Sequence, residues 1–338
     1  MKNYSRKSFI ILLLALSLHA CKTEEIDSGI IVYACGVEKA SNGNFIGKFW
    51  ENTNSYNLND STTEAITSSI FVKNNDVFIA GYECGKGKQM TAKYWKNGIS
   101  VDLTDGKYMS WAKCIYVTDS TVYVSGYEET PTGQFGTLWM NGKKVRYTSE
   151  LQSGNINCVF VNENKTYLCG LESTNMNGNH FKYWINDFAY SLGNGVYGSD
   201  IITSIYNYKG DTYVTGRMST VNDVNYDYWI NGKPYTLKNG NVSFFPNSLF
   251  VLNDNVYIAG YTIAKNNNYI AKYWVNGNEV NLTDESQNAN AYTIYVLEDD
   301  IFVGGSINGK PCYWHNGKLV KLNNDVGGAV HSIFVTRK

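Results

Sequence analysis

Few residues in this chain are of the types that usually perform catalysis or hold a metal ion. After residue 21 the sequence contains three histidines, His180, His315 and His331, and none of them has metal-ligand spacing to another. No Gly-X-Ser-X-Gly nucleophile motif and no His-Glu-X-X-His motif occurs. Adjacent carboxylates such as Glu128 and Glu129 diverge on a strand, so they cannot flank one scissile bond. We therefore predict no metal ion, no other cofactor and no catalytic residue, although loops far apart in the sequence can still assemble an active site.

Six cysteines follow Cys21, and two of them lie where a disulfide could join neighbouring strands. If residues 162–165 form a turn, Val161 pairs with Thr166 and Cys158 lies directly opposite Cys169. In a non-hydrogen-bonded antiparallel pair the Cα atoms are about 4.5 Å apart, a distance that a disulfide can bridge. Equivalent positions elsewhere in the chain hold Ser or Ala, so a requirement for a small buried residue is the alternative explanation.

The spacing of tryptophan indicates the architecture that must position these residues. A motif with an aromatic residue or Leu before the Trp, and an Asn two residues after it, recurs at intervals of 45, 44, 45, 45, 45 and 40 residues. Its tryptophans are Trp50, Trp95, Trp139, Trp184, Trp229, Trp274 and Trp314. A repeat of 40–50 residues is typical of a propeller or a solenoid. Because these tryptophans recur in every repeat, we expect them in the core.

One repeat reads as four short strands. Residues 69–103 contain β-branched and aromatic runs separated by polar turns, and Asn97-Gly98 is a strong signal for a hairpin between the last two runs. The runs are apolar on both faces, so both faces must be covered, and radial stacking of sheets achieves this. No stretch after residue 30 keeps a helical apolar period for three turns, which excludes an α-solenoid. We predict an all-β propeller with four-stranded antiparallel blades.

The number of motifs predicts seven blades and also how the ring closes. The first-strand motif begins at Ser69, Cys114, Cys158, Ser204, Ser248, Thr293 and Ser332. The repeats start with a second strand at residues 31–36 and end with a first strand at residues 332–335. Pairing of these two strands would complete the seventh blade and remove the exposed edges. The predicted propeller domain therefore spans residues 30–338.

Two sets of residues could form a binding site on this scaffold. The loops between second and third strands vary most, and they share one face, the long-loop face, with the links between blades. We expect a second set, the polar-capable residue just before each first strand, to line the mouth of the central channel: Ser68, Lys113, Asn157, Thr203, Asn247, Tyr292 and His331.

Six residues follow from these sets as candidate ligand-binding residues: Trp111, Lys113, Asn157, Phe245, Tyr292 and His331. Trp111 and Phe245 are aromatic residues outside the repeated motif, and such rings can stack on sugars or anchor a protein partner. The alternative is that strand ends at a wet channel simply prefer polar residues, and that the additional aromatic residues only fill gaps between blades.

Residues 1–21 are typical of a targeting segment, with three basic residues before an apolar run, Phe9–Leu18, that is short for a membrane span. The sequence Leu18-His19-Ala20-Cys21 resembles the lipobox of bacterial lipoproteins. This resemblance implies that Cys21 carries acyl chains such as palmitate and becomes the mature N-terminus. An ordinary secretory peptide cleaved near Ala20 is the alternative. Residues 22–29 then form a tether, whose Lys22–Glu25 stretch looks like the surface-export signal of some Bacteroidota lipoproteins.

The repeats resemble those of uncharacterised Bacteroidota lipoproteins that carry Tyr-Trp-X-Asn-Gly motifs and form seven-bladed propellers. The resemblance covers residues 30–338, nearly all of the chain after the targeting segment. It implies an outer-membrane lipoprotein held in the membrane by its lipid anchor, and either exposed on the cell surface or facing the periplasm. It implies no established activity.

Charge and composition narrow the classes of partner. Without residues 1–21 the chain has 26 basic and 30 acidic residues in an even mixture, which excludes the basic footprint of a nucleic-acid-binding protein. We therefore expect a lipid-anchored binding propeller of the cell envelope that recognises a glycan or a protein through its long-loop face. The alternatives are a polysaccharide hydrolase or lyase built on a propeller, and a structural subunit of an envelope complex.

Overall fold

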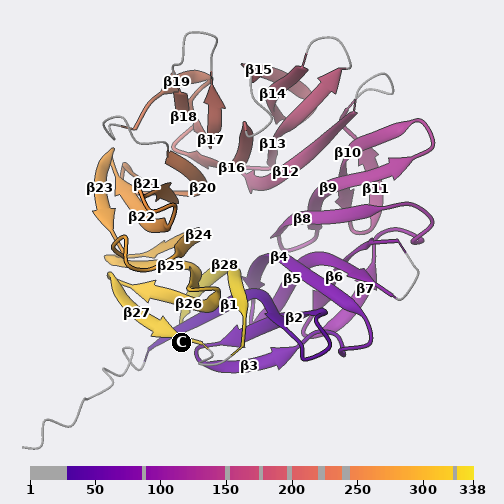
Figure 1. Cartoon of the computed structure of the whole chain (residues 1–338). Helices are drawn as coiled ribbons and strands as arrows, with labels where there is room; N and C mark the ends of the chain where they lie inside the picture. The colour runs from indigo at the N-terminus through magenta and orange to yellow at the C-terminus, as the bar shows by residue number, and fades with distance from the viewer. Residues whose placement is uncertain are drawn as a thin grey trace, which may run out of the picture.

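The fold is a ring of seven sheets around a central axis. The computed structural model describes residues 29–85, 89–148, 153–174, 178–195, 200–219, 225–237, 244–322 and 326–338. Within these residues every regular element is a β-strand, and the strands form seven four-stranded antiparallel sheets. Figure 1 shows the sheets arranged radially, as the blades of a propeller. The predicted seven-bladed propeller is therefore confirmed.

The strands are numbered in chain order, and we number the blades from the first one that is continuous in sequence. Blade 1 consists of β4 (Glu64–Lys73), β5 (Asp76–Cys84), β6 (Thr91–Lys96) and β7 (Ile99–Asp102). Blade 2 consists of β8 (Ser110–Val117), β9 (Val122–Thr130), β10 (Gly133–Met140) and β11 (Lys143–Arg146). Blade 3 consists of β12 (Ser153–Asn162), β13 (Lys165–Thr174), β14 (Gly178–Ile185) and β15 (Phe188–Gly195). Blade 4 consists of β16 (Ile201–Tyr208), β17 (Asp211–Ser219), β18 (Asn225–Ile230) and β19 (Lys233–Tyr235). Blade 5 consists of β20 (Phe244–Leu252), β21 (Asn255–Ile263), β22 (Tyr269–Val275) and β23 (Asn278–Asn281). Blade 6 consists of β24 (Ala289–Leu297), β25 (Asp300–Ile307), β26 (Lys310–His315) and β27 (Lys318–Lys321). Blade 7 joins β28 (Gly328–Arg337) to β1 (Ile30–Lys39), β2 (Phe45–Glu51) and β3 (Asn54–Asn57).

Blade 7 closes the ring as the sequence predicts. The C-terminal strand β28 pairs antiparallel with β1, with Val335 opposite Val32 and Ser332 opposite Cys35. Figure 1 shows the yellow β28 beside the indigo β1. The two ends of the described chain therefore belong to one sheet, and β1 has no open edge on its inner side.

The first strand of each blade is the innermost. The strands β4, β8, β12, β16, β20, β24 and β28 each pack against the first strands of both neighbouring blades. Because each first strand runs from the long-loop face to the turns that precede second strands, successive residues along it lie at successive depths along the axis. Equivalent positions of the repeat therefore form rings of seven residues.

The repeated tryptophans and asparagines have separate structural roles. The seven tryptophans are buried, each at most 3% exposed, in clusters that combine residues of adjacent blades. In the 97–98 turn both residues have positive φ, as the turn type requires. The Asn97 side chain also accepts a hydrogen bond from the backbone N–H of Val77, at 2.8 Å. In the other six blades the equivalent bond is accepted by the side chains of Asn52, Asn141, Asn186, Asn231, Asn276 and Asn316.

Each innermost strand contains a β-bulge, and the predicted starts of these strands were therefore wrong by three to five residues. In β4 the register shifts between Thr67 and Ser69. The buried positions change phase at the same point, from Ala65 and Thr67 before the bulge to Ile70 after it. The alternation of buried and exposed positions breaks at this point, so the sequence pattern resembles the end of a strand. The strand in fact continues through the break.

The bulge explains why a glycine recurs in every second strand. A Cβ atom on Gly126 would lie 1.9 Å from the carbonyl oxygen of Trp111, because the bulged strand brings that carbonyl against β9. The glycines opposite the other six bulges meet a backbone oxygen at 1.9–2.3 Å: Gly36, Gly81, Gly170, Gly216, Gly260 and Gly305. Only glycine can occupy this position without displacing the inner strand.

Candidate functional site

The seven polar-capable residues predicted at the channel mouth are the bulge residues of the innermost strands. Each one is skipped by the pairing register of its blade, as Ser68 is in β4 and Lys113 is in β8. They therefore lie within the strands, at an intermediate depth along the axis, rather than at the mouth. All seven are partly exposed.

Four of the bulge residues tie neighbouring blades together. Asn157 donates from Nδ2 to the carbonyl oxygen of Ile202 at 2.6 Å. Equivalent bonds to the next blade are made by Thr203 to Pro246 O at 3.5 Å, by Asn247 to Ala291 O at 2.8 Å and by His331 to Thr67 O at 2.6 Å. These bonds account for Asn157 structurally, although the sequence predicts it as a ligand-binding residue.

Lys113 is different, because its ammonium group has no anionic partner among the described residues. Its Nζ lies 3.1 Å from the centre of the Trp111 ring and 5.9 Å from that of Tyr127. Trp111 is held in place by its indole N–H, which donates to Ser68 Oγ at 2.8 Å, and by the edge of Tyr82. Burial lowers the pKa of Lys113 to about 8. The structure thus brings Trp111 and Lys113 together as a cation–π pair.

His331 and Tyr292 form a second pair of candidates next to Lys113. Their rings meet edge to face, with centroids 5.9 Å apart. Burial lowers the pKa of His331, and the nearby charge of Lys113 contributes in the same direction. Because the carbonyl of Thr67 can only accept, the Nδ1 atom of His331 carries the proton and Nε2 remains an acceptor. Tyr292 is hydrogen-bonded to Ser306, and burial raises its pKa.

Phe245 extends the group on the far side of Tyr292. Its ring stacks on Tyr261 at 4.9 Å, with an angle of 7° between the planes, and the Arg217 guanidinium lies 4.4 Å from its centre. Burial raises the pKa of Tyr261, and the nearby phenols of Tyr269 and Tyr292 contribute in the same direction. We call Trp111, Lys113, Arg217, Phe245, Tyr261, Tyr292 and His331 the axial cluster. It offers the permanent cation of Arg217, the titratable groups of Lys113 and His331, and several aromatic faces.

The carboxyl group of Asp227 lies near Arg217. Burial raises the pKa of Asp227 to about 7, while the backbone N–H of Leu237, which donates to it at 2.7 Å, and the charge of Arg217 act in the opposite direction. Asp227 is therefore only partly ionised at neutral pH and offsets little of the positive charge. Arg217, Tyr261 and Asp227 were not named from the sequence, because nothing in their spacing separates them from ordinary strand residues.

A closed ring of aromatic side chains lies below the bulge residues along the axis. Three residues beyond each bulge, every innermost strand contributes one Phe or Tyr, and each ring contacts both neighbours at centroid distances of 4.4–5.2 Å. The members are Phe71, Tyr116, Phe160, Tyr206, Phe250, Tyr295 and Phe334. Burial raises the pKa of Tyr295 to about 12. This aromatic ring forms the base of the axial cluster. Its sequence signal is an aromatic residue at one fixed position of the repeat, which the sequence analysis does not use.

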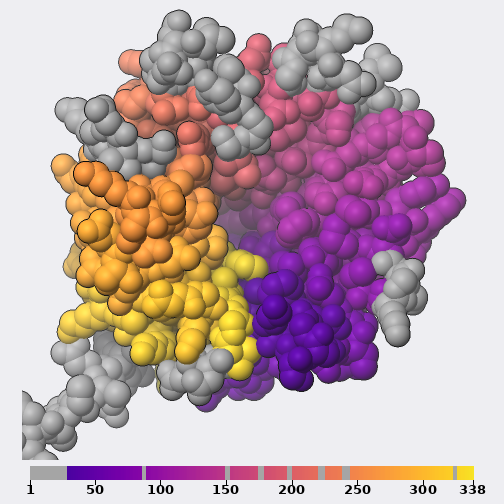
Figure 2. All heavy atoms as spheres, in the orientation of Figure 1, coloured from indigo at the N-terminus to yellow at the C-terminus, as the bar shows by residue number. Residues whose placement is uncertain are grey.

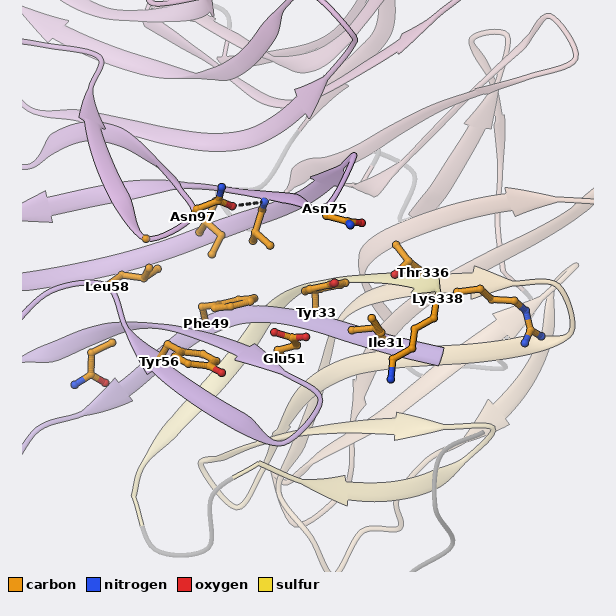
Figure 3. A pocket seen from close by; sticks show the side chains of 15 residues that line it. Ile31, Tyr33, Phe49, Glu51, Tyr56, Leu58, Asn75, Asn97, Thr336 and Lys338 are labelled. Atoms are coloured by element: carbon orange, nitrogen blue, oxygen red, sulfur yellow. Dashed lines mark hydrogen bonds between the residues drawn. The ribbon is translucent and has the colours of Figure 1, made fainter. Parts of the chain in front are cut away.

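A separate cavity lies on the opposite face, between blades 7 and 1, and we call it the turn-face groove (Figure 3). It has a volume of about 830 Å³ and is lined by residues that include Tyr33, Phe49, Glu51, Tyr56 and Asn97. Phe49 is nearly parallel to Tyr33 at 6.2 Å and to Tyr56 at 5.5 Å. Asn97 already accepts the hydrogen bond from the backbone N–H of Val77, drawn in Figure 3 as a dashed line. Sequence reasoning had placed binding on the long-loop face alone.

The cysteine register is as predicted, but no disulfide is formed. Cys158 lies opposite Cys169 in the pairing of β12 with β13, and both are free thiols in this structure. The sulfur of Cys158 instead lies 3.2 Å from that of Cys114 in the neighbouring blade.

The structure leaves other sequence predictions untested. Cys21 and the segment before it lie outside the described residues, so lipidation stays a prediction. Among the described residues, no group of three or more His, Cys, Asp or Glu side chains is arranged to hold a metal ion. No helix in the described part of the chain has the length and apolar character needed to cross a membrane.

Comparisons with known proteins support the fold and no more. No protein-family model and no curated protein matches the sequence. The fold is similar to a solved puromycin hydrolase, with a TM-score of 0.58 and 9% identity over 88% of this chain and 52% of that one. It is similar also to a puromycin-hydrolyzing peptidase of Mycobacterium tuberculosis, with a TM-score of 0.57, 9% identity and the same coverage. The chain spans about half the length of these proteins, and the likeness shows the propeller architecture alone.

Proposed function

We propose that this chain is a binding propeller of the cell envelope that recognises an acidic glycan at the axial cluster. The observation that carries the proposal is the ammonium group of Lys113, which is largely buried and has no carboxylate partner among the described residues. Other buried lysines are paired, as Lys48 is with Glu38 at 2.9 Å and Lys93 with Glu83 at 2.6 Å. A buried charge without a partner costs stability, so a site that keeps one is suited to a ligand that supplies the counter-charge.

The surroundings of Lys113 favour a sugar acid over a small inorganic anion. The faces of Phe245 and Tyr261 and the ring of Tyr292 lie within the same cluster, and aromatic faces suit the C–H faces of sugar rings. Arg217 provides a second cation, and His331 Nε2 can accept a hydrogen bond from a hydroxyl group. Figure 2 shows the centre of the ring recessed between the blades, a shape that admits a narrow chain more easily than a globular surface.

The experiment is a glycan array with the chain lacking residues 1–21, followed by calorimetry on the best ligands. We expect uronic-acid or sialic-acid glycans among the hits, and Lys113→Met should weaken their binding roughly 30-fold or more, as expected for loss of a buried charge pair. The matched control is Tyr56→Ser, which alters the turn-face groove and should leave binding unchanged. The assignment would be overturned if Lys113→Met bound normally and Tyr56→Ser did not, because the groove would then be the site.

The envelope location is part of the proposal and rests on the Leu18–Cys21 sequence. A lipid anchor at Cys21 would hold the propeller at the membrane through the tether of residues 22–29. Metabolic labelling with a fatty acid should mark the full chain and not Cys21→Ala, which should also be released from membranes. Labelling of Cys21→Ala at the normal level would exclude this anchor.

A polysaccharide lyase is the second candidate, and the pKa of Lys113 is the observation that favours it. An amine whose pKa is about 8 can act as a base near neutral pH. In a β-elimination it would take the proton on C5 of a uronic acid, the C4–O bond would break, and the released sugar oxygen would be protonated. The product has a carbon–carbon double bond that absorbs in the ultraviolet. Absence of this absorbance with every acidic glycan that binds would remove the lyase from consideration.

A further inference from the structure

Two cysteines occupy the same repeat position in adjacent blades. Cys114 in β8 and Cys158 in β12 each follow a bulge residue on an innermost strand, and their sulfur atoms are 3.2 Å apart. In the other five blades this position holds Ser69, Ser204, Ser248, Thr293 and Ser332. The cysteines are therefore confined to one contact between blades, the contact between blades 2 and 3.

The hydroxyl group at this position has a function that a thiol performs poorly. Ser332 accepts a hydrogen bond from the backbone N–H of Ile70 in the next blade at 3.2 Å. Ser69 and Ser248 accept equivalent bonds from Ile115 and Ile294. A thiol is a weak acceptor, and Cys114 instead directs its sulfur toward Cys158 and Val159 O. A requirement for a small residue would be met equally by Ser, so size alone does not explain the pair.

We propose that Cys114 and Cys158 form a disulfide that joins blades 2 and 3 beside the axis. A disulfide has an S–S distance of about 2.05 Å, so the sulfur atoms must approach by about 1.2 Å, which small side-chain rotations can supply. Both residues are partly exposed, whereas Cys169 is fully buried. Although Cys169 lies opposite Cys158 in the strand register, the sulfur within contact distance of Cys158 is that of Cys114.

The oxidant would be a disulfide of a thiol-oxidising protein of an oxidising compartment. The Cys114 thiolate attacks one sulfur of the donor disulfide, a mixed disulfide forms, and the donor's other sulfur leaves as a thiolate. The Cys158 thiolate then attacks the Cys114 sulfur and releases the second donor sulfur. Two electrons pass to the donor, and the two thiol protons are lost to solvent or to the donor thiolates. A hydrogen bond from Cys158 lowers the pKa of Cys114, which suits Cys114 for the first attack.

The link would support the wall of the axial cluster. Lys113 directly precedes Cys114, and Asn157 directly precedes Cys158. Lys113 makes no side-chain hydrogen bond to blade 3 among the described residues, unlike the bulge residues that tie other blades together. A disulfide one residue away would replace the missing tie and leave the Lys113 ammonium group available.

Peptide mapping tests the proposal directly, because trypsin places the three cysteines in three different peptides. These are residues 114–143, 147–165 and 166–182. The full chain is isolated from its host envelope, free thiols are alkylated without reduction, and the digest is analysed by mass spectrometry. We expect peptide 114–143 linked to 147–165, with Cys169 alkylated only after unfolding. A link between 147–165 and 166–182, or alkylated free thiols at both Cys114 and Cys158, would overturn the proposal.

Thermal melting gives a second and independent measurement. The disulfide closes a loop of 44 residues, and its reduction should lower the Tm by roughly 5–10 °C. Cys114→Ser and Cys158→Ser should abolish this difference between oxidised and reduced protein, while Cys169→Ser should keep it. Serine is already present at the 114 position of four other blades, so these variants are expected to fold. A redox-dependent Tm that persists in Cys114→Ser would contradict the assignment.

Discussion

Replacing Lys113 with Met would test whether the buried charge that is proposed to bind an anionic ligand lowers the free energy of unfolding. Burial lowers the pKa of Lys113 from 10.5 to about 8, which corresponds to about 3 kcal/mol of destabilisation at neutral pH. Contact with the Trp111 face returns about 1–2 kcal/mol of this. Met keeps the unbranched stem and loses the charge. We therefore expect Lys113→Met to raise the free energy of unfolding at pH 7 by about 1–2 kcal/mol, and the Tm by roughly 2–5 °C.

The effect has a definite dependence on pH. In the unfolded chain Lys113 keeps its proton up to about pH 10.5, whereas in the folded protein it releases the proton near pH 8. Between these values the unfolded state binds more protons, so the contribution of Lys113 to stability becomes more favourable as the pH rises. The advantage of Lys113→Met should therefore be full below about pH 8 and should disappear by about pH 10.5.

The assay is urea unfolding of the chain lacking residues 1–21 at several pH values between 7 and 10.5. The matched control is Lys93→Met, because Lys93 is also buried but lies 2.6 Å from Glu83 and 3.2 Å from Asp102. Removing Lys93 leaves carboxylates without their partner, and we expect a loss of about 1–3 kcal/mol. Opposite signs for the two substitutions are the diagnostic result.

Two results would refute the reasoning. If Lys113→Met destabilised the protein at pH 7 as Lys93→Met does, Lys113 would be satisfied by contacts within the fold. If the difference from the parent protein did not change between pH 7 and 10.5, the charge of Lys113 would not be the cause of any stability change. In either case Lys113 would not be a buried charge kept for an anionic ligand.

Three further predictions concern the scaffold. Trp274→Ala should cost about 3–5 kcal/mol, because the ring is fully buried against Phe244, whereas Trp111→Ala should cost less in urea unfolding and should weaken ligand binding. Gly126→Ala should lower the Tm by several degrees, since its Cβ would lie 1.9 Å from a backbone oxygen, and Gly29→Ala, whose nearest neighbour is 3.9 Å away, should not. Deletion of residues 329–338 removes most of β28, exposes the edge of β1, and should give aggregates in size-exclusion chromatography; a soluble form with the parent Tm would show that closure is dispensable.

The fold could be predicted because every blade repeats the same local signals. A buried Trp, a turn that begins with an Asn at positive φ, and a backbone N–H that donates to the side chain of that Asn are each decided within one blade and its neighbour. Seven copies make such a pattern visible above the variation between blades. The half-blades at the two ends then required ring closure, and the pairing of β28 with β1 confirms it.

The bulges could not be predicted in the same way, because their effect on the sequence imitates a strand end. At Ser68 the buried positions shift by one residue, and the periodicity of a strand is lost at that point. The repeated Gly81 was visible, but its cause lies in a carbonyl group on the neighbouring strand. Only the three-dimensional register connects the two observations.

The candidate site was predictable in its position and not in its chemistry. Ring geometry places equivalent repeat positions together. Once the innermost strand is known, the position near the axis follows for Lys113, Tyr292 and His331. Which of them are used within the fold depends on side-chain directions between blades. His331 donates to Thr67 O, whereas the Lys113 ammonium group faces the rings of Trp111 and Tyr127.

The contacts between innermost strands show how a seven-fold repeat can accommodate a site. Five of the seven contacts have a hydrogen bond from a bulge residue or to the small residue that follows it, judged from the described residues. The two others are the contact between β8 and β12 and that between β24 and β28, and they are the contacts at which Lys113 and Tyr292 lie. At the second, the edge-to-face contact of Tyr292 with His331 takes the place of a hydrogen bond. At the first, the two sulfur atoms do so. Lys113 and Tyr292 are thus left available to a ligand at the two contacts that other interactions hold together.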